Sequence, residues 1–190
     1  EIGIKRSEYR HATRDLAKAL DMNYAFAAQY LEVDPAILGI EKLKYEDGAM
    51  DDVAMEYYQV DPGRFKGVFG SAVLSRYPIK YSEVRPLIHQ PYDWYDGEKV
   101  KTTFLENTRR FGSKIIFENE LTREMKVGGR HYFRVDLHVP QLPKETLTII
   151  NVHLEIKCLP KGRRAQMQEI LSYIINIDNP LILMGDLNAA

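Results

Sequence analysis

The sequence is poor in cysteine, contains no long apolar segment and carries almost no net charge. Its single cysteine, Cys158, excludes an internal disulfide framework. This favours the reducing cytoplasm as the location of the protein but does not demonstrate it. No run of about 18 apolar residues occurs, so no membrane-spanning helix is predicted. A net charge of −1 and a pI near 6.6 provide no overall electrostatic footprint for nucleic acid or an anionic membrane.

What the sequence does contain is typical of one globular domain. Its 190 residues suffice for a single core of reasonable size. Hydrophobic residues make up 45% and charged residues 28%, as in ordinary soluble proteins. Stretches with helical and strand periodicity alternate along the chain, which predicts an α/β fold with packed sheets and outer helices.

The last ten residues combine a buried-strand pattern with polar side chains. Residues 180–184 form an apolar run that predicts a strand buried on both faces, and Gly185 ends it. Asp186 and Asn188 follow, two positions apart, so in an extended chain their side chains leave on the same side. This pair suits a hard metal ion or an activated water, and the alternative is an Asx-type turn after a strand.

Two further apolar stretches end near polar groups. Residues 146–154 predict a strand on which Asn151 and His153 share one face, while Thr148, Ile150, Val152 and Leu154 share the other. A histidine at a strand end is commonly structural, but a parallel neighbour of the final strand would bring His153 beside Asp186 and Asn188. Residues 67–75 predict another buried strand, closed by Pro78.

These three stretches together resemble the endonuclease/exonuclease/phosphatase family of metal-dependent phosphoesterases, which includes DNase I-like nucleases, sphingomyelinases and inositol polyphosphate 5-phosphatases. The likeness lies in Gly185-Asp186-Leu187-Asn188, in the strand ending at His153, and in Ala72-Val73-Leu74-Ser75-Arg76-Tyr77-Pro78-Ile79. The resemblance implies a four-layer α-β-β-α sandwich of two packed mixed sheets, with the site at the ends of the strands.

The resemblance also implies a division of labour among the site residues. Glu1 falls where the family has a metal-ligating glutamate, so it would hold Mg²⁺, or Mn²⁺ in its place. Asp186 would orient or deprotonate the attacking water, and Asn188 would position that water or the transition-state oxygens. His153 would donate to a phosphate oxygen or protonate the leaving group.

The family pattern extends beyond both ends of this sequence. An asparagine normally precedes the glutamate, and an aspartate and an Asp-His pair follow the Gly-Asp-x-Asn motif. We therefore expect residues 1–190 to be a single partial domain, inactive alone, of a larger enzyme.

The chemistry leaves two classes of function open. The first is hydrolysis of a phosphate ester, whose substrate could be nucleic acid, a phospholipid headgroup or a phosphorylated small molecule. The second is a non-catalytic protein of the same fold that binds a phosphate ligand or acts as a scaffold. The sequence does not specify the substrate or the oligomeric state.

Several other elements are predicted from periodicity and turn residues. Ser7 is predicted to cap a helix to about Leu20 with an apolar stripe of Tyr9, Ala12, Leu16, Ala19 and Leu20. Further predictions are a strand over 23–33, a self-packed aromatic loop over 91–97 bordering the cleft, a short helix over 98–110 and an edge strand over 113–118. Residues 131–139 predict a strand with one apolar face, and the helix after Lys161 has the stripe Met167, Ile170, Leu171, Ile174 and Ile175.

Overall fold

The computed structural model describes residues 1–2, 10–33, 65–98, 104, 108 and 125–189. The chain divides into two compact units. The first comprises Glu1–Leu31, Gly67–Asp93 and Gly128–Ala190, and the second comprises Glu32–Lys66 and Trp94–Val127. Both predicted strands that carry site residues belong to the first unit.

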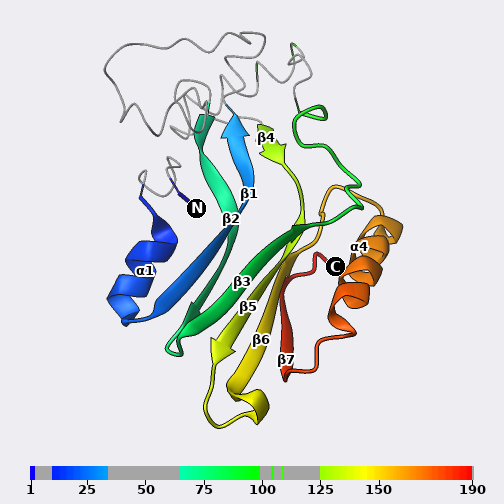
Figure 1. Ribbon diagram of the computed structural model, residues 1–190. Helices are drawn as coiled ribbons and strands as arrows, with labels where there is room; N and C mark the ends of the chain where they lie inside the picture. Colours follow the sequence, from blue (N-terminus) through cyan, green and yellow to red (C-terminus); the bar gives the residue numbers. More distant parts are fainter. Residues whose placement is uncertain (3–9, 34–64, 99–103, 105–107, 109–124, 190) are drawn as a thin grey trace, which may run out of the picture. The chain divides into compact units, whose positions relative to one another are not determined.

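The described strands form two sheets (Figure 1). In chain order the elements are α1 (Ala12–Leu20), β1 (Asn23–Val33), β2 (Phe65–Ser75), β3 (Ile79–Pro86), β4 (Met125–Gly128), β5 (His131–His138), the 3-10 turn η3 (Pro143–Glu145), β6 (Thr146–His153), α4 (Pro160–Ile174) and β7 (Leu181–Asp186). One sheet has the order β2-β1-β4 and the other β3-β5-β6-β7. The second sheet is mixed, because β5 pairs antiparallel with β3 and β6, whereas β6 and β7 are parallel.

Within the first unit, a hydrophobic core lies between strands β1 and β2 and the sheet β3-β5-β6-β7. Ala27 of β1 and Val73 of β2 belong to the same buried cluster as Phe133, Val135 and Ile149 of the other sheet. Their positions in the strands alternate with residues on the opposite faces, as the two-residue period of a strand requires. The sheets therefore pack face to face, as predicted.

Helices α1 and α4 cover the outer faces. His11, which precedes α1, contacts Tyr24 and Phe26 of β1 edge-on at centroid distances of 5.7 and 5.8 Å. On the other side, Ile170 of α4 packs in a second buried cluster with Ile150 and Val152 of β6. Helix, sheet, sheet and helix thus succeed one another, which is the predicted four-layer order (Figure 1).

The passage from one sheet to the other occurs at Gly128 and Gly129. Gly128 has φ of 141°, and a Cβ there would lie 2.2 Å from the carbonyl oxygen of Gln29. Only glycine avoids both the strained conformation and the clash. Gly128 and Gly129 therefore link β4 to β5, the strand adjacent to β6.

The first helix differs from its prediction in start and in orientation. It begins at Ala12, with the His11 Nδ1 accepting from the Arg14 amide at 3.1 Å, whereas Ser7 lies outside the described residues. Thr13 and Ala17 are its buried residues, while Leu16 and Leu20 are about half exposed. The predicted stripe is therefore wrong at Leu16 and Leu20, because the small residues Thr13 and Ala17 occupy the buried side of the helix.

Two strands are buried differently from their predicted patterns. The predicted polar face of β5 is covered, because Tyr132 packs under α4 and Asp136 is bonded inside the sheet. By contrast, β7 is only partly buried, through Leu181 and Leu183 on one face, since Ile182 and Met184 on the other are 46% and 51% exposed. The reason is position: β5 is central in its sheet, whereas β7 is the edge strand of the described sheet.

The remaining predictions have mixed outcomes. The strand over 23–33 is confirmed with the predicted bounds, and β5 and β6 pair antiparallel. In α4, Ile170 is buried but Leu171 and Ile175 are exposed, so its predicted stripe is only partly correct. The predicted strand over 113–118 and most of the helix over 98–110 lie outside the described residues. None of the described helices is long and apolar enough to cross a membrane.

Candidate active site

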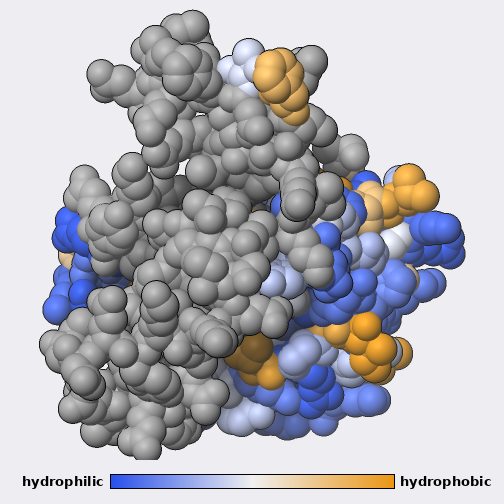
Figure 2. Space-filling view, turned by 90° about the horizontal axis from the view of Figure 1, so that it is seen from above, coloured by the Kyte–Doolittle hydropathy of each residue, from blue (hydrophilic) through white to orange (hydrophobic). Residues whose placement is uncertain are grey.

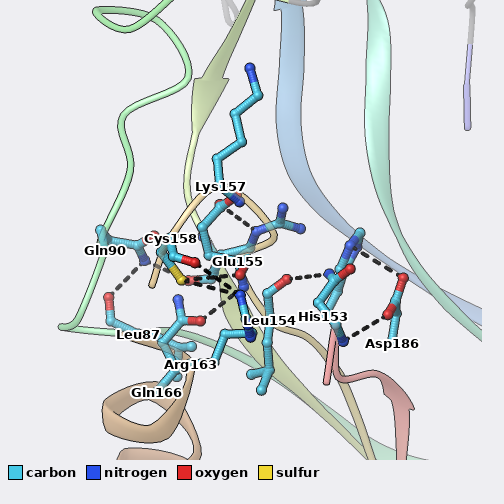
Figure 3. A network of polar contacts seen from close by, with 12 residues as sticks. Leu87, Gln90, His153, Leu154, Glu155, Lys157, Cys158, Arg163, Gln166 and Asp186 are labelled. Carbon is cyan, nitrogen blue, oxygen red and sulfur yellow. Dashed lines mark hydrogen bonds and ion pairs between the residues drawn. The ribbon is translucent and has the colours of Figure 1, made fainter. Parts of the chain in front are cut away.

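The parallel pairing of β6 and β7 brings the predicted site residues together. In the register of these strands, Asn151 lies opposite Met184 and His153 opposite Asp186. The His153 Nε2 is 3.8 Å from the Asp186 Oδ2, and Figure 3 shows the two side chains facing each other at the ends of their strands. The prediction that the strand ending in His153 lies beside Asp186 is therefore confirmed.

Gly185 is required for this pairing. Its φ is 131°, and a Cβ at this position would lie 1.9 Å from the carbonyl oxygen of Val152, its partner in β6. A larger residue could not approach the neighbouring backbone so closely. The glycine immediately before Asp186 thus lets β7 stay in contact with β6 up to the His153–Asp186 pair.

Asn188 does not continue the extended chain. Its φ is 48°, in the left-handed region, and its amide donates to the Asp186 Oδ1 at 3.0 Å. Its side-chain Nδ2 donates to the carbonyl of Leu154 at 2.8 Å. Of the two alternatives, an extended chain and an Asx-type turn, the turn is the one that forms. One oxygen of Asp186 closes this turn while the other faces His153.

The exposure of the pair leaves it accessible. The His153 side chain is 24% exposed and the Asp186 side chain 63%. The ring of Phe69 lies 6.0 Å from that of His153 and forms one wall beside it. Asn151, two residues before His153 in β6, donates from its side-chain nitrogen to the carbonyl of Ala72 at 2.9 Å and so links β6 to β2. The structure therefore assigns Asn151 to sheet packing and leaves His153 and Asp186 open to a ligand.

Glu1 is connected to this region through the backbone. Ile2 and Val68 exchange backbone hydrogen bonds of 2.9 and 2.8 Å, and Val68 precedes Phe69, which contacts His153. Among the described residues, no three side chains of His, Cys, Asp or Glu gather closely enough to hold a metal ion. Glu1 and Asp186 nevertheless offer hard carboxylate oxygens, the donor type that Mg²⁺ prefers. The metal ligand role of Glu1 stays a prediction.

A buried ion pair behind the site is absent from the sequence predictions. The Arg130 Nε donates to the Glu155 Oε2 at 2.9 Å, with both side chains almost fully buried. The guanidinium also lies 5.3 Å from the centre of the Tyr30 ring, and burial raises the pKa of Tyr30 to about 12. The sequence signal for this pair is one basic and one acidic residue in apolar surroundings. Residues 130 and 155 are too far apart in the chain for helix or strand periodicity to predict their contact.

His131 is a second buried group that the sequence did not single out. It is 3% exposed, and its Nε2 has no hydrogen-bond partner among the residues that the structure describes. Burial, together with the positive charge of Arg130 and the proximity of His153, lowers the pKa of His131 to about 4. The pairing of Tyr132 with Val152 places His131 across from His153 in the antiparallel register. The neutral imidazole of His131 therefore lies on β5, the neighbouring strand, opposite His153.

The contacts of Gln166 and of the aromatic loop over 91–97 are also defined. Gln166 is fully buried, accepts from the Glu155 amide at 2.9 Å and donates to the carbonyl of His89 at 3.1 Å. Gln166 thus has a structural role, since it joins the segment after β6 to His89. In the loop over 91–97, Tyr92 lies under the ammonium of Lys157 at 5.1 Å, and, within the second unit, Trp94 lies under that of Lys126 at 4.8 Å.

Comparison with known proteins identifies the family. Residues 11–190 match the Endonuclease/Exonuclease/phosphatase family. The chain therefore belongs to this family, and its α/β sandwich is of the DNase I-like class. No curated protein sequence matches the chain.

A crystal structure of an endonuclease/exonuclease/phosphatase from Beutenbergia cavernae DSM 12333 is similar to the chain, with 19% sequence identity and a TM-score of 0.45. The similarity covers 99% of this chain and 35% of that one. The chain thus spans about a third of the length of the structure that it matches.

Proposed function

We propose that the protein to which this chain belongs is a metal-dependent phosphoesterase. The observation that carries the proposal is the pairing of His153 with Asp186 at 3.8 Å, at the open ends of two parallel strands. A proton donor and a carboxylate held side by side, both accessible, suit hydrolysis by an attacking water. Membership of the family supports the same chemistry.

The roles of the residues follow from their surroundings. Asp186 orients or deprotonates the attacking water through the oxygen that faces His153, because its other oxygen accepts from the Asn188 amide. His153 donates to a phosphate oxygen or protonates the leaving group. Asn188 keeps one carboxamide oxygen for the water, since its nitrogen is bonded to Leu154. Glu1 would hold Mg²⁺ or Mn²⁺, which when bound neutralises negative charge on the phosphoryl group.

The test is hydrolysis of a diester, bis-(p-nitrophenyl) phosphate, and a monoester, p-nitrophenyl phosphate, by the full-length protein. Each ester is incubated with Mg²⁺, with Mn²⁺ and with EDTA. The Asp186→Ala and His153→Ala variants should each lose about a hundredfold or more in rate. Asp178→Ala and His89→Ala, which change exposed groups elsewhere, serve as matched controls.

The outcomes separate the possible functions. Metal-dependent turnover that either site substitution abolishes supports the phosphoesterase, and the preferred ester separates nuclease-like from phosphatase-like substrates. A folded full-length protein that hydrolyses neither ester, or that turns both over equally well in EDTA, contradicts the proposal. If neither ester is hydrolysed, the non-catalytic phosphate-binding protein is the better description, whereas equal turnover in EDTA would indicate a hydrolase that needs no metal ion.

A further inference from the structure

The segment that follows the catalytic strand exposes large apolar side chains. Residues 156–164 connect β6 to the first turn of α4 and begin directly after Leu154 and Glu155. Within this segment Ile156 is 58% exposed and Leu159 is 65% exposed. Removing such side chains from water is favourable. The segment therefore presents unused apolar surface within a few residues of His153.

The same segment is strongly basic in an otherwise balanced chain. Residues 156–168 contain Lys157, Lys161, Arg163 and Arg164 and no aspartate or glutamate, whereas the whole chain has a net charge of −1. Lys161 and Arg164 are exposed on the first turn of α4. Figure 2, which views the molecule from above, shows orange apolar side chains among blue polar ones on the described surface. Positive charge and apolar surface thus occur together.

The loop is held so that Ile156 and Leu159 stay outside. The buried Glu155 accepts from the Lys157 amide at 2.9 Å, and the Cys158 thiol donates to the Glu155 carbonyl at 3.2 Å. The Arg163 Nη1 donates to the carbonyl of Cys158 at 3.0 Å. Figure 3 shows these contacts converging beneath the loop. Because polar groups fill its inner side, the apolar side chains cannot simply fold inward.

Neighbouring residues extend the surface. A Cβ on Gly162 would lie 3.2 Å from the Cβ of Pro91, so the segment around Pro91 packs on the first turn of α4. The ammonium of Lys157 lies 5.1 Å from the centre of the Tyr92 ring. Tyrosine and lysine both combine an apolar body with a polar tip, the combination favoured where apolar and aqueous phases meet.

We propose that residues 156–164 dock the protein on an anionic lipid surface and thereby present the His153–Asp186 site to phosphate esters of lipid headgroups. An anionic bilayer accounts for both features, since acyl chains accept Ile156 and Leu159 while headgroups attract the basic side chains. A nucleic acid backbone accounts for the charges but not for the two exposed aliphatic residues. The docking surface is independent of hydrolysis, and only the substrate class rests on the proposed function.

The test is flotation of the full-length protein with vesicles of phosphatidylcholine alone or mixed with phosphatidylserine. We expect binding only to the mixed vesicles, and weaker binding as salt is added, because salt screens surface charge. Ile156→Asp combined with Leu159→Asp should lower binding by at least about tenfold, since it removes insertion and adds like charge. Ile175→Asp is the matched control, because Ile175 is 79% exposed beyond the other end of α4.

The basic residues are tested separately. Lys161→Ala combined with Arg164→Ala should weaken binding to the mixed vesicles by about tenfold or more, as each basic group near the surface contributes about fivefold. Lys18→Ala with Arg76→Ala makes the same change in net charge elsewhere and should leave binding intact. Thermal unfolding confirms that every variant is folded.

Three results would overturn the inference. One is the absence of binding to phosphatidylserine vesicles at low salt, and another is unchanged binding by the Ile156/Leu159 double variant. The third is binding of a DNA oligonucleotide that depends on Lys161 and Arg164 while vesicles are not bound, which would identify a nucleic acid surface. Hydrolysis of the soluble nitrophenyl esters should not change in the double variant, so failure of docking and failure of catalysis are distinguished.

Discussion

Two acid–base pairs lie almost side by side at the end of β6, and they differ in burial. The His153–Asp186 pair is open to solvent, with its closest atoms 3.8 Å apart. The Arg130–Glu155 pair starts two residues later and is closed, with side chains 3% and 1% exposed and a 2.9 Å bond. Solvent thus reaches the pair at the end of β6 but not the pair that follows it.

The difference in burial implies a difference in role. A buried pair has given up its hydration, so each partner depends on the other, and removing one leaves an uncompensated charge. An exposed pair contributes little to folding, because water and salt screen it. The closed pair therefore fixes the end of β6 and the loop after it, while the open pair remains available to bind a ligand.

The largest expected effect is on the closed pair. Glu155→Ala should lower the free energy of unfolding by about 3–5 kcal/mol, because it leaves Arg130 buried without its partner. Urea unfolding followed by circular dichroism measures the change. Asp178→Ala, which breaks the exposed Lys144–Asp178 pair, is the control and should cost less than about 1 kcal/mol. Equal losses in the two variants would contradict the distinction between closed and open pairs.

The open pair should be disrupted indirectly by a change in the backbone. Gly185→Ala should cost about 3 kcal/mol, because the added Cβ meets the Val152 carbonyl and the residue has positive φ. Urea unfolding measures this loss of stability. At Gly129 a Cβ would meet only the Gln90 side chain at 3.1 Å, so Gly129→Ala serves as the control with a smaller loss. A Gly185→Ala variant as stable as the wild type would show that β6 and β7 need not approach so closely.

His131 follows Arg130 in the chain and lies opposite His153. Its imidazole should make the stability of the fold depend on pH. The pKa of His131 is lowered to about 4 in the folded protein, below the ordinary value of 6.5, so the unfolded chain takes up the proton first on acidification. Its contribution is complete above pH 6.5 and is lost as the pH falls towards 4. By about pH 5 the loss should reach roughly 2 kcal/mol.

Denaturant unfolding at neutral pH and at about pH 5 tests this prediction. The His131→Gln variant should lose less stability on acidification than the wild type, whereas the exposed His89→Gln should behave like the wild type. If His131→Gln and the wild type respond identically, the imidazole is not kept neutral by its surroundings.

The smallest expected effect is that of the open pair on folding. Asp186→Ala should change the free energy of unfolding by less than about 1 kcal/mol, since the carboxylate is largely exposed. Thermal unfolding of the variant beside Glu155→Ala measures the contrast directly. A loss as large as that of Glu155→Ala would mean that Asp186 serves the fold before it serves a ligand.

Much of the candidate site could be predicted because its determinants are local. The apolar runs before His153 and Asp186 specify strands, and Gly185 marks the point of close approach. The family pattern then identifies which strand ends belong together. The turn at Asn188 was an open alternative, because Asp-x-Asn satisfies both an extended chain and an Asx-type turn until the Leu154 carbonyl is placed beside it.

The sequence by itself determined where strands run and which side chains share a face, as in β1, whose bounds match their prediction, and β6. Only the tertiary structure decided which faces are covered: Tyr132 lies beneath α4, whereas Ile182 and Met184 remain exposed at the sheet edge. It also decided that Arg130 meets Glu155 and that His131 is buried. The physical reason is that the period of a strand is set by its own backbone, while burial and ion pairing depend on neighbours distant in the chain.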